Sequence, residues 1–121
     1  MEPKSVLLID DSNDMLALEK MILEGAGFNV FTASSGTSGF EVLSKIAHPD
    51  LILLDQQLND MTGFDFMNLL EKRNPEIIAN VPIVILTGAE QPEPSQAVGY
   101  IQKFPDIDIF LETVHHFMGK H

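Results

Sequence analysis

Short apolar runs alternate with longer amphipathic segments from one end of the chain to the other. Five of these runs have the length and composition of β-strands: residues 6–9, 28–33, 51–54, 83–86 and 99–102. The third run is apolar at every position, which is typical of a strand covered on both faces of a sheet. Strands that alternate with helices predict an α/β fold, here a doubly wound, five-stranded parallel sheet in the order 2-1-3-4-5.

The segments between the strands carry helical patterns. Ser12 or Asn13 can cap a first helix, in which we expect Met15, Leu18 and Ile22 to form the apolar face. The last segment has the most regular pattern, a single apolar stripe at helical spacing: Ile107, Phe110, Leu111, Val114, Phe117 and Met118.

Glycines and prolines limit the remaining helices. A second helix is expected to open at Ser35, to include Ile46 and to stop before Pro49, and Pro75 is expected to end the third. The interval between Thr87 and Tyr100 contains two prolines and two glycines. It leaves room for about one helical turn, so we expect the fourth helix to be short or absent.

Four of the predicted strands run directly into a carboxylate, a hydroxyl or an amine. These side chains are Asp10 and Asp11 after the first strand, Asp55 after the third, Thr87 after the fourth and Lys103 after the fifth. In a parallel sheet all of them reach the same carboxyl edge, where open α/β sheets bind their ligands. The sequence therefore predicts one pocket that holds three carboxylates, a hydroxyl and an amine.

Carboxylates held this close repel one another, so the pocket needs a counter-charge. Mg²⁺ suits it, because this ion prefers oxygen ligands and keeps coordination positions for water and phosphate. The main-chain carbonyl of Gln57 can add a ligand. Aspartate can act as a carboxylate nucleophile that forms an aspartyl phosphate, which suggests Asp55 as the acceptor. Lys103 can pair with the phosphoryl oxygens, and Thr87 can donate a hydrogen bond to one of them.

This ordered set resembles the receiver domains of two-component response regulators, over residues 4–118. The resemblance implies a flavodoxin-like fold in which Asp10 and Asp11 bind Mg²⁺ and Asp55 is phosphorylated. It further implies a histidine kinase or phosphotransfer protein as the donor and a protein target for the switched surface. A domain of this kind is a phosphoryl acceptor rather than an enzyme that turns over a separate substrate.

The resemblance also assigns roles to the other strand-end residues. It implies Thr87 and Lys103 as the partners of the phosphoryl group, Tyr100 as an aromatic rotamer switch, and Gly63 as the glycine of the turn after the acceptor. The chain departs from the family in three places: Asn59 replaces a usual proline, Phe104 separates Lys103 from Pro105, and the interval from Thr87 to Lys103 is shorter.

Composition narrows the range of partners. The chain has 121 residues, which fits a single domain spanning 1–121, and carries 7 basic against 18 acidic side chains, for a net charge of −11. We expect such a surface to repel nucleic acid and anionic membranes. Cysteine is absent, which excludes disulfides, and no apolar run is long enough to span a bilayer. We therefore expect a cytoplasmic protein.

Other functions fit the residues less well. A receiver-fold interaction module that no longer switches, or a receiver cut from a hybrid kinase, is the main alternative. A flavodoxin-type electron carrier would need a phosphate-binding loop after the first strand, where this chain has acidic residues. A haloacid-type phosphatase would need an acid at Gln57. The histidines His115, His116 and His121 could suggest a metal site, but neighbouring helix positions do not face each other.

Overall fold

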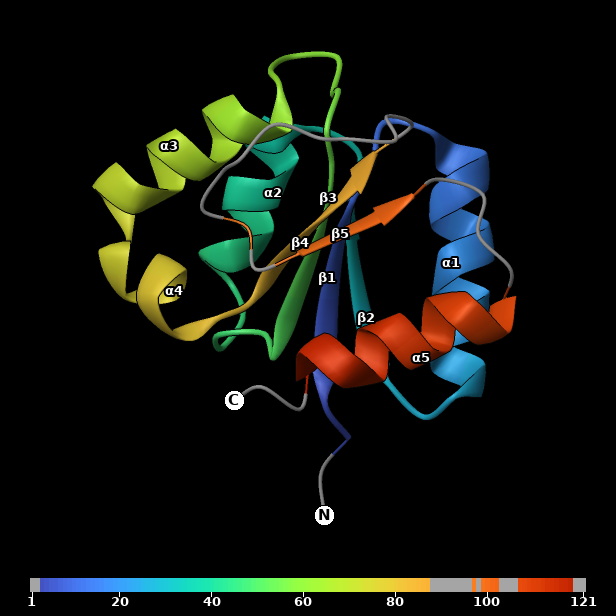
Figure 1. Ribbon diagram of the computed structural model, residues 1–121. Coiled ribbons are helices and arrows are strands. Elements are labelled where there is room, and N and C mark those ends of the chain that lie inside the picture. Colours follow the sequence, from blue (N-terminus) through green and yellow to red (C-terminus); the bar gives the residue numbers. More distant parts are fainter. Residues whose placement is uncertain (1–2, 88–96, 98, 103–106, 119–121) are drawn as a thin grey trace.

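A parallel sheet lies at the centre of the molecule, with helices on both of its faces (Figure 1). The computed structural model describes residues 3–87, 97, 99–102 and 107–118. Its strands are β1 (Ser5–Ile9), β2 (Asn29–Ala33), β3 (Leu51–Asp55), β4 (Ile83–Thr87) and β5 (Gly99–Gln102). They follow the order β2-β1-β3-β4-β5, and each neighbouring pair is parallel. The predicted α/β class and doubly wound order are confirmed.

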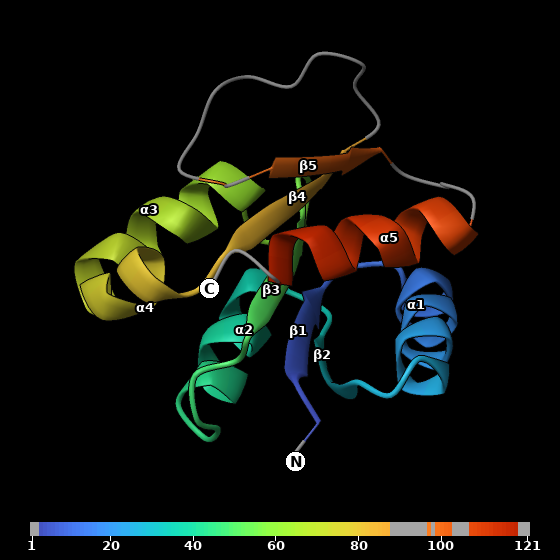
Figure 2. The same ribbon diagram turned by 60° about the horizontal axis from the view of Figure 1, so that its bottom comes forward.

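The helices of the described residues divide between the two faces of the sheet, as Figure 2 shows. The first face carries α1 (Asn13–Gly25) and α5 (Ile107–Met118). The second carries α2 (Gly36–Leu43), α3 (Gly63–Arg73) and α4 (Pro75–Asn80). Both layers are needed because successive side chains of a strand point to opposite faces.

The first strand illustrates how this two-sided core forms. Val6 and Leu8 belong to the apolar cluster under α1 and α5, whereas Leu7 and Ile9 belong to the cluster under α2, α3 and α4. All four side chains are completely buried. A continuous apolar run is therefore what a strand covered on both faces requires.

The buried face of α1 differs from the expected one. Leu16, Glu19 and Leu23 are buried, while Leu18 is 43% exposed. The sequence offers two rows of residues at helical spacing, and the row that faces the sheet includes the acidic Glu19, which a search for apolar positions discards. The predicted cap is correct at Ser12, whose side chain accepts a hydrogen bond from the N–H of Met15.

Two other helix limits also differ from the predictions. The second helix ends at Leu43, before Ile46. Pro75 does follow the end of α3, but it also begins α4, a helix that the sequence analysis did not assign. Proline is well tolerated in the first turn of a helix, where its missing N–H would have no helical partner. The buried side chain of Ile77 anchors this short helix to the core.

Some predictions fall outside the described residues. They concern the short or absent helix expected between Thr87 and Tyr100, and the role of Lys103. Among the helices that the structure does describe, none combines the length and hydropathy that a membrane span requires.

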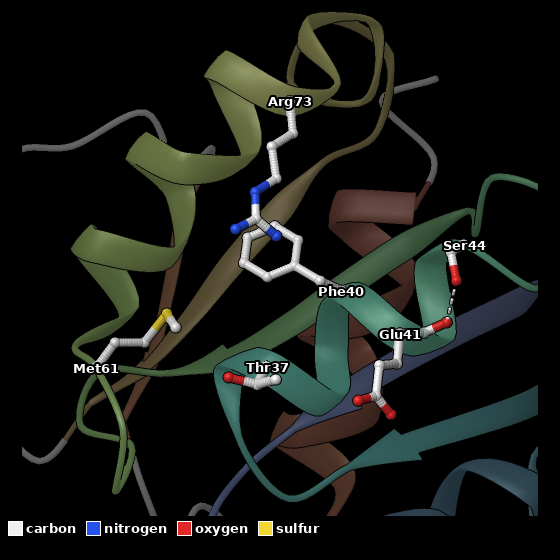
Figure 3. A pocket seen from close by; sticks show the side chains of 6 residues that line it. All are labelled: Thr37, Phe40, Glu41, Ser44, Met61 and Arg73. Carbon is white, nitrogen blue, oxygen red and sulfur yellow. Dashed lines mark hydrogen bonds between the residues drawn. The ribbon is translucent and has the colours of Figure 1, made fainter.

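Helices α2 and α3 leave a surface pocket of about 310 Å³ between them (Figure 3). The Arg73 guanidinium lies over the Phe40 ring, 4.3 Å from its centroid, and Phe40 stacks on Phe66 with centroids 4.5 Å apart. Arg73 thus covers part of the aromatic contact that joins the two helices. The lining of this pocket contains none of the acidic residues at the strand ends.

Candidate functional site

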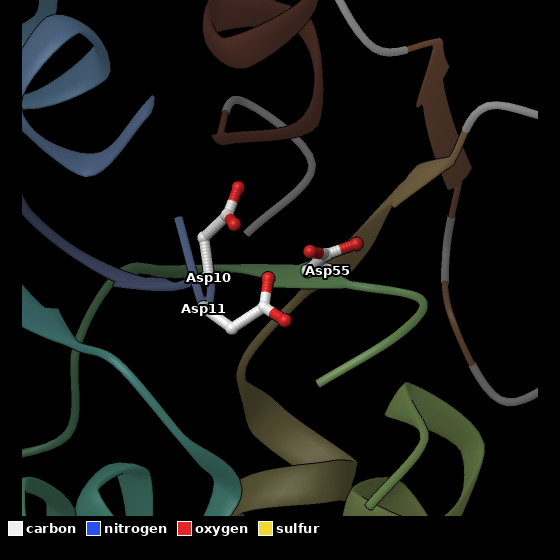
Figure 4. Close-up of side chains that lie close together, drawn as sticks. All are labelled: Asp10, Asp11 and Asp55. Carbon is white, nitrogen blue, oxygen red and sulfur yellow. The ribbon is translucent and has the colours of Figure 1, made fainter. Parts of the chain in front are cut away.

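Three carboxylates meet at the carboxyl ends of β1 and β3 (Figure 4). The carboxylate oxygens of Asp10, Asp11 and Asp55 that could share an ion all lie within 4.8 Å of one another. The sheet brings them together, because Ile9 is paired with Leu54 and the next residue of each strand is an aspartate. Asp10 is 2% exposed and Asp55 is 1% exposed.

The backbone holds two of these carboxylates in place. The main-chain N–H of Ser12 donates to Asp10 Oδ1 at 2.9 Å, and the N–H of Gln57 donates to Asp55 Oδ1 at 3.2 Å. In both cases an aspartate binds the backbone two residues further on, as in Asx turns. The same local geometry therefore orients the carboxylate at the end of each strand.

Electrostatics make this cluster a candidate cation site. Like charges at this separation destabilise one another, and burial removes the water that would otherwise screen them. A divalent cation with a preference for oxygen ligands relieves both costs. Within the part of the chain that the structure describes, this is the one group of three or more acidic, histidine or cysteine side chains close enough to share an ion.

The loop after β3 is tightly folded beside the cluster. Gln57 and Thr62 form an antiparallel bridge, and the N–H of Leu58 donates to the carbonyl of Met61 at 3.0 Å. The N–H of Gly63 donates to the carbonyl of Gln56 at 2.8 Å. These bonds fix the course of the backbone around Gln57, whose carbonyl was the predicted further ligand.

Thr87 lies at the end of β4 and is 1% exposed. Its hydroxyl donates a hydrogen bond to the side-chain carbonyl of Gln56, with an oxygen–oxygen distance of 2.5 Å. Asp55 pairs with Leu86 in the sheet, so Thr87 and Gln56 are the next residues of two adjacent strands. Sequence reasoning did not single out Gln56, and its type gave no signal, because a glutamine after a strand is usually a solvated turn residue.

The comparisons with known proteins agree on one family. A family model described as the response regulator receiver domain matches residues 6–112. The chain belongs to this family. As a receiver domain it carries the acidic cluster at the strand ends where a phosphoacceptor site is expected.

Two curated relatives are named as regulators of polar differentiation and of the cell cycle. The chain is 25% identical to the polar-differentiation response regulator DivK of Brucella ovis over 96% of its own length and 97% of that protein. It is 40% identical to the cell cycle transcriptional regulator CtrA of Caulobacter vibrioides, over 71% of this chain and 35% of that regulator.

Solved structures give the same result. The chemotaxis response regulator CheY4 of Vibrio cholerae superposes with a TM-score of 0.85 at 28% identity, over 95% of this chain and 98% of CheY4. A CheY-like receiver domain protein of Methanospirillum hungatei JF-1 has a TM-score of 0.84 at 25% identity, over 98% and 95% of the two chains. The receiver fold is therefore shared over nearly the full length of these chains.

The remaining strand-end residues of this receiver domain are only partly described. The backbone of Tyr100 pairs with Ile85 in the sheet, and Gln102 pairs with Thr87. Lys103 follows Gln102 but lies outside the described residues, as does His121. The two neighbouring histidines contact different aromatic rings. The ring centroid of His115 lies 5.2 Å from that of Phe28, and the ring centroid of His116 lies 5.1 Å from that of Phe117.

A carboxylate in the loop after β3 connects the site region to the second helix. Asp60 accepts hydrogen bonds from the N–H of Thr37 at 2.9 Å, from its hydroxyl at 2.8 Å, and from the N–H of Gly36 at 2.9 Å. The bonds from the backbone of Thr37 and Gly36 hold the pKa of Asp60 below its usual value. Together with Ser35, which accepts from the N–H of Ser38, Asp60 satisfies the first turn of α2.

Proposed function

We propose that this receiver domain is a phosphorylation switch in which Asp55 accepts the phosphoryl group. The observation that supports this most directly is the group of three carboxylates at the ends of adjacent strands, two of them almost completely buried. Such a cluster repels an anionic phosphodonor unless a cation is present. A bound Mg²⁺ would neutralise the incoming phosphate and let it approach the acceptor.

The proposed reaction is a displacement at phosphorus. An oxygen of the Asp55 carboxylate forms a bond to the phosphorus atom as the P–N bond of a donor phosphohistidine breaks, and the bonding electron pair stays on the imidazole nitrogen. The hydrogen bond from the N–H of Gln57 to Oδ1 orients the carboxylate for this attack. The donor is accordingly a histidine kinase or a phosphotransfer protein.

The other strand-end residues would bind or read the product. In this proposal Asp10, Asp11, Asp55 and the main-chain carbonyl of Gln57 supply the ligands of Mg²⁺. The hydroxyl of Thr87 donates a hydrogen bond to one phosphoryl oxygen, and the amine of Lys103 pairs with another.

The modified site would act by changing a protein-interaction face, with Tyr100 as the side chain that responds. A net charge of −11 disfavours nucleic acid and anionic membrane as partners, so the target of the switched face is a protein, reached in the cytoplasm.

Intact mass spectrometry tests the acceptor. Incubation with Mg²⁺ and acetyl phosphate should add the mass of one phosphoryl group, and the addition should disappear with a metal chelator. Asp55→Asn should abolish it. Asp14→Asn is the matched control, because Asp14 is an exposed acid in the first turn of α1 near the same edge. Labelling of the Asp55→Asn variant equal to that of the wild type would refute the assignment.

A receiver-fold module that does not switch is the alternative, and the short interval from Thr87 to Lys103 favours it. Hydrogen exchange with and without beryllofluoride, a mimic of the phosphoryl group, separates the two functions. A switch changes amide protection beyond the residues that contact the mimic. A module that binds the mimic with no such change does not switch.

A further inference from the structure

The hydrogen bond between Thr87 and Gln56 joins two residues whose main chains are already held in the sheet. The N–H of Gln56 donates to the carbonyl of Leu86 at 3.0 Å, and its carbonyl accepts from the N–H of Gly63 at 2.8 Å. Gln56 is therefore fixed on both sides by the backbone, directly after Asp55. Its side-chain carbonyl accepts from the buried hydroxyl of Thr87.

A hydroxyl group has one proton and donates one hydrogen bond. Thr87 cannot give this proton to Gln56 and to a phosphoryl oxygen on Asp55 at the same time. The hydrogen bond that the structure contains is thus incompatible with the bond that the phosphorylated site needs.

We infer that Gln56 is a positioning residue for Thr87: it holds the Thr87 hydroxyl in the unphosphorylated protein and competes with the phosphoryl group for its proton. This inference rests on the proposed function. The exchange favours the phosphorylated state, because a hydrogen bond to a charged oxygen is stronger than one to a neutral amide carbonyl. Gln56 therefore sets how readily Thr87 is released.

Removing the acceptor should make the phosphorylated state easier to reach. In Gln56→Met the side chain keeps its length but has no amide carbonyl, so binding of the mimic no longer breaks the hydrogen bond between Thr87 and residue 56. The net contribution of one neutral hydrogen bond corresponds to about a fivefold change in an equilibrium constant. We expect Gln56→Met to bind beryllofluoride about fivefold more tightly than the wild type in the presence of Mg²⁺.

A double-mutant cycle shows whether the effect passes through Thr87. Calorimetry measures beryllofluoride affinity in the wild type, Gln56→Met, Thr87→Val and the double variant. Gln56→Met should have no effect when Thr87 is already valine. Asn59→Ala is the control, because Asn59 is an exposed amide of the same loop. An equal effect of Gln56→Met in both backgrounds, or an unchanged or weaker affinity in the wild-type background, overturns the inference.

A measurement on the unmodified protein complements the cycle. The side-chain amide resonances of Gln56 should shift when beryllofluoride binds, because their carbonyl loses its donor. If the mimic binds and these resonances do not move, Gln56 does not compete for the proton, although the phosphorylation switch stands. If the wild type neither binds the mimic nor accepts a phosphoryl group on Asp55, both the proposed function and this inference fail.

Discussion

Gly63 lies so close to Asp55 that a Cβ atom at this position would be 2.7 Å from the main-chain carbonyl oxygen of Asp55. The Cα of Gln56 would be 3.3 Å away. Both neighbours are backbone atoms, one in the last residue of β3 and one in the residue after it, so no side-chain rotation can make room. The close approach to the backbone therefore explains why the first residue of α3 is glycine. Backbone conformation does not explain it, because Gly63 does not have a positive φ.

We predict that Gly63→Ala displaces the loop after β3. The substitution should lower the free energy of unfolding by about 1–3 kcal/mol, the usual range for overpacking. It should also weaken Mg²⁺ binding, because the displaced backbone carries Asp55 and Gln57. Urea denaturation and calorimetry with Mg²⁺ measure the two effects. Gly25→Ala is the control, since nothing lies within 4 Å of a Cβ at Gly25 in α1. Equal stability of the two variants would contradict the prediction.

Asp60→Ala should destabilise the protein by about 1 kcal/mol at neutral pH, the scale of a lost helix N-cap. The hydrogen bonds from Thr37 and Gly36 lower the pKa of Asp60 in the folded state. A carboxyl with a depressed folded pKa stabilises the protein above its unfolded pKa, and this contribution is lost as the pH falls through the folded value. The difference between wild type and variant should therefore shrink at acid pH.

Urea denaturation at neutral pH and below the ordinary aspartate pKa of about 3.9 measures this difference. Asp60→Asn is the matched variant, because it keeps an acceptor oxygen but removes the charge and its titration. It should lose less stability than Asp60→Ala at neutral pH. A difference between the wild type and Asp60→Ala that grows toward acid pH would show that Asp60 does not act through its ionised form.

Gly99 in β5 carries no side chain where the ring of Phe117 from α5 lies, and a Cβ at this position would overlap that ring. We predict that Gly99→Ala destabilises the protein by about 1–3 kcal/mol. Phe117→Leu should recover part of this loss when the two substitutions are combined, because the smaller side chain vacates the space. Thermal unfolding of the single and double variants measures the coupling. If the effects of the two substitutions on stability are strictly additive, the Phe117 ring moves aside for the added Cβ at no cost in free energy.

The parts of the fold that could be predicted from the sequence are those determined by local pattern. The apolar runs that end at Asp10 and Asp55 are strands buried on both faces, and pairing of parallel strands then brings these acids together. The prediction of which face of α1 is buried was wrong, because that face includes Glu19. A search for apolar residues at helical spacing does not reveal a buried acid.

The contacts that sequence reasoning missed join residues far apart in the chain. Gln56 meets Thr87 across 31 positions, and Asp60 meets Thr37 across 23. Each pair consists of common polar residues in loops, at strand ends or in the first turn of a helix, which carry no spacing signal. Such pairs become visible only once the register of the sheet and the course of the loop after β3 are known.

Asp11 is half-buried beside two almost fully buried acids, Asp10 and Asp55. Asp11→Asn removes one charge from the cluster and keeps the size of the side chain. Without Mg²⁺ the variant should be at least as stable as the wild type, because like-charge repulsion falls. With Mg²⁺ the order should reverse, since an ion that binds only the folded state stabilises it by an amount that rises with the logarithm of the ratio of its concentration to its Kd.

Thermal unfolding across a series of Mg²⁺ concentrations distinguishes a metal ligand from a structural residue. The wild type should unfold at increasing temperature as Mg²⁺ is added, Asp14→Asn should behave likewise, and Asp11→Asn should respond weakly. Acetyl phosphate labelling of Asp11→Asn should fall with the loss of metal, even though Asp55 is intact. A variant that is less stable without Mg²⁺ but keeps the full response to the ion would show that Asp11 stabilises the turn after β1 and is not a ligand.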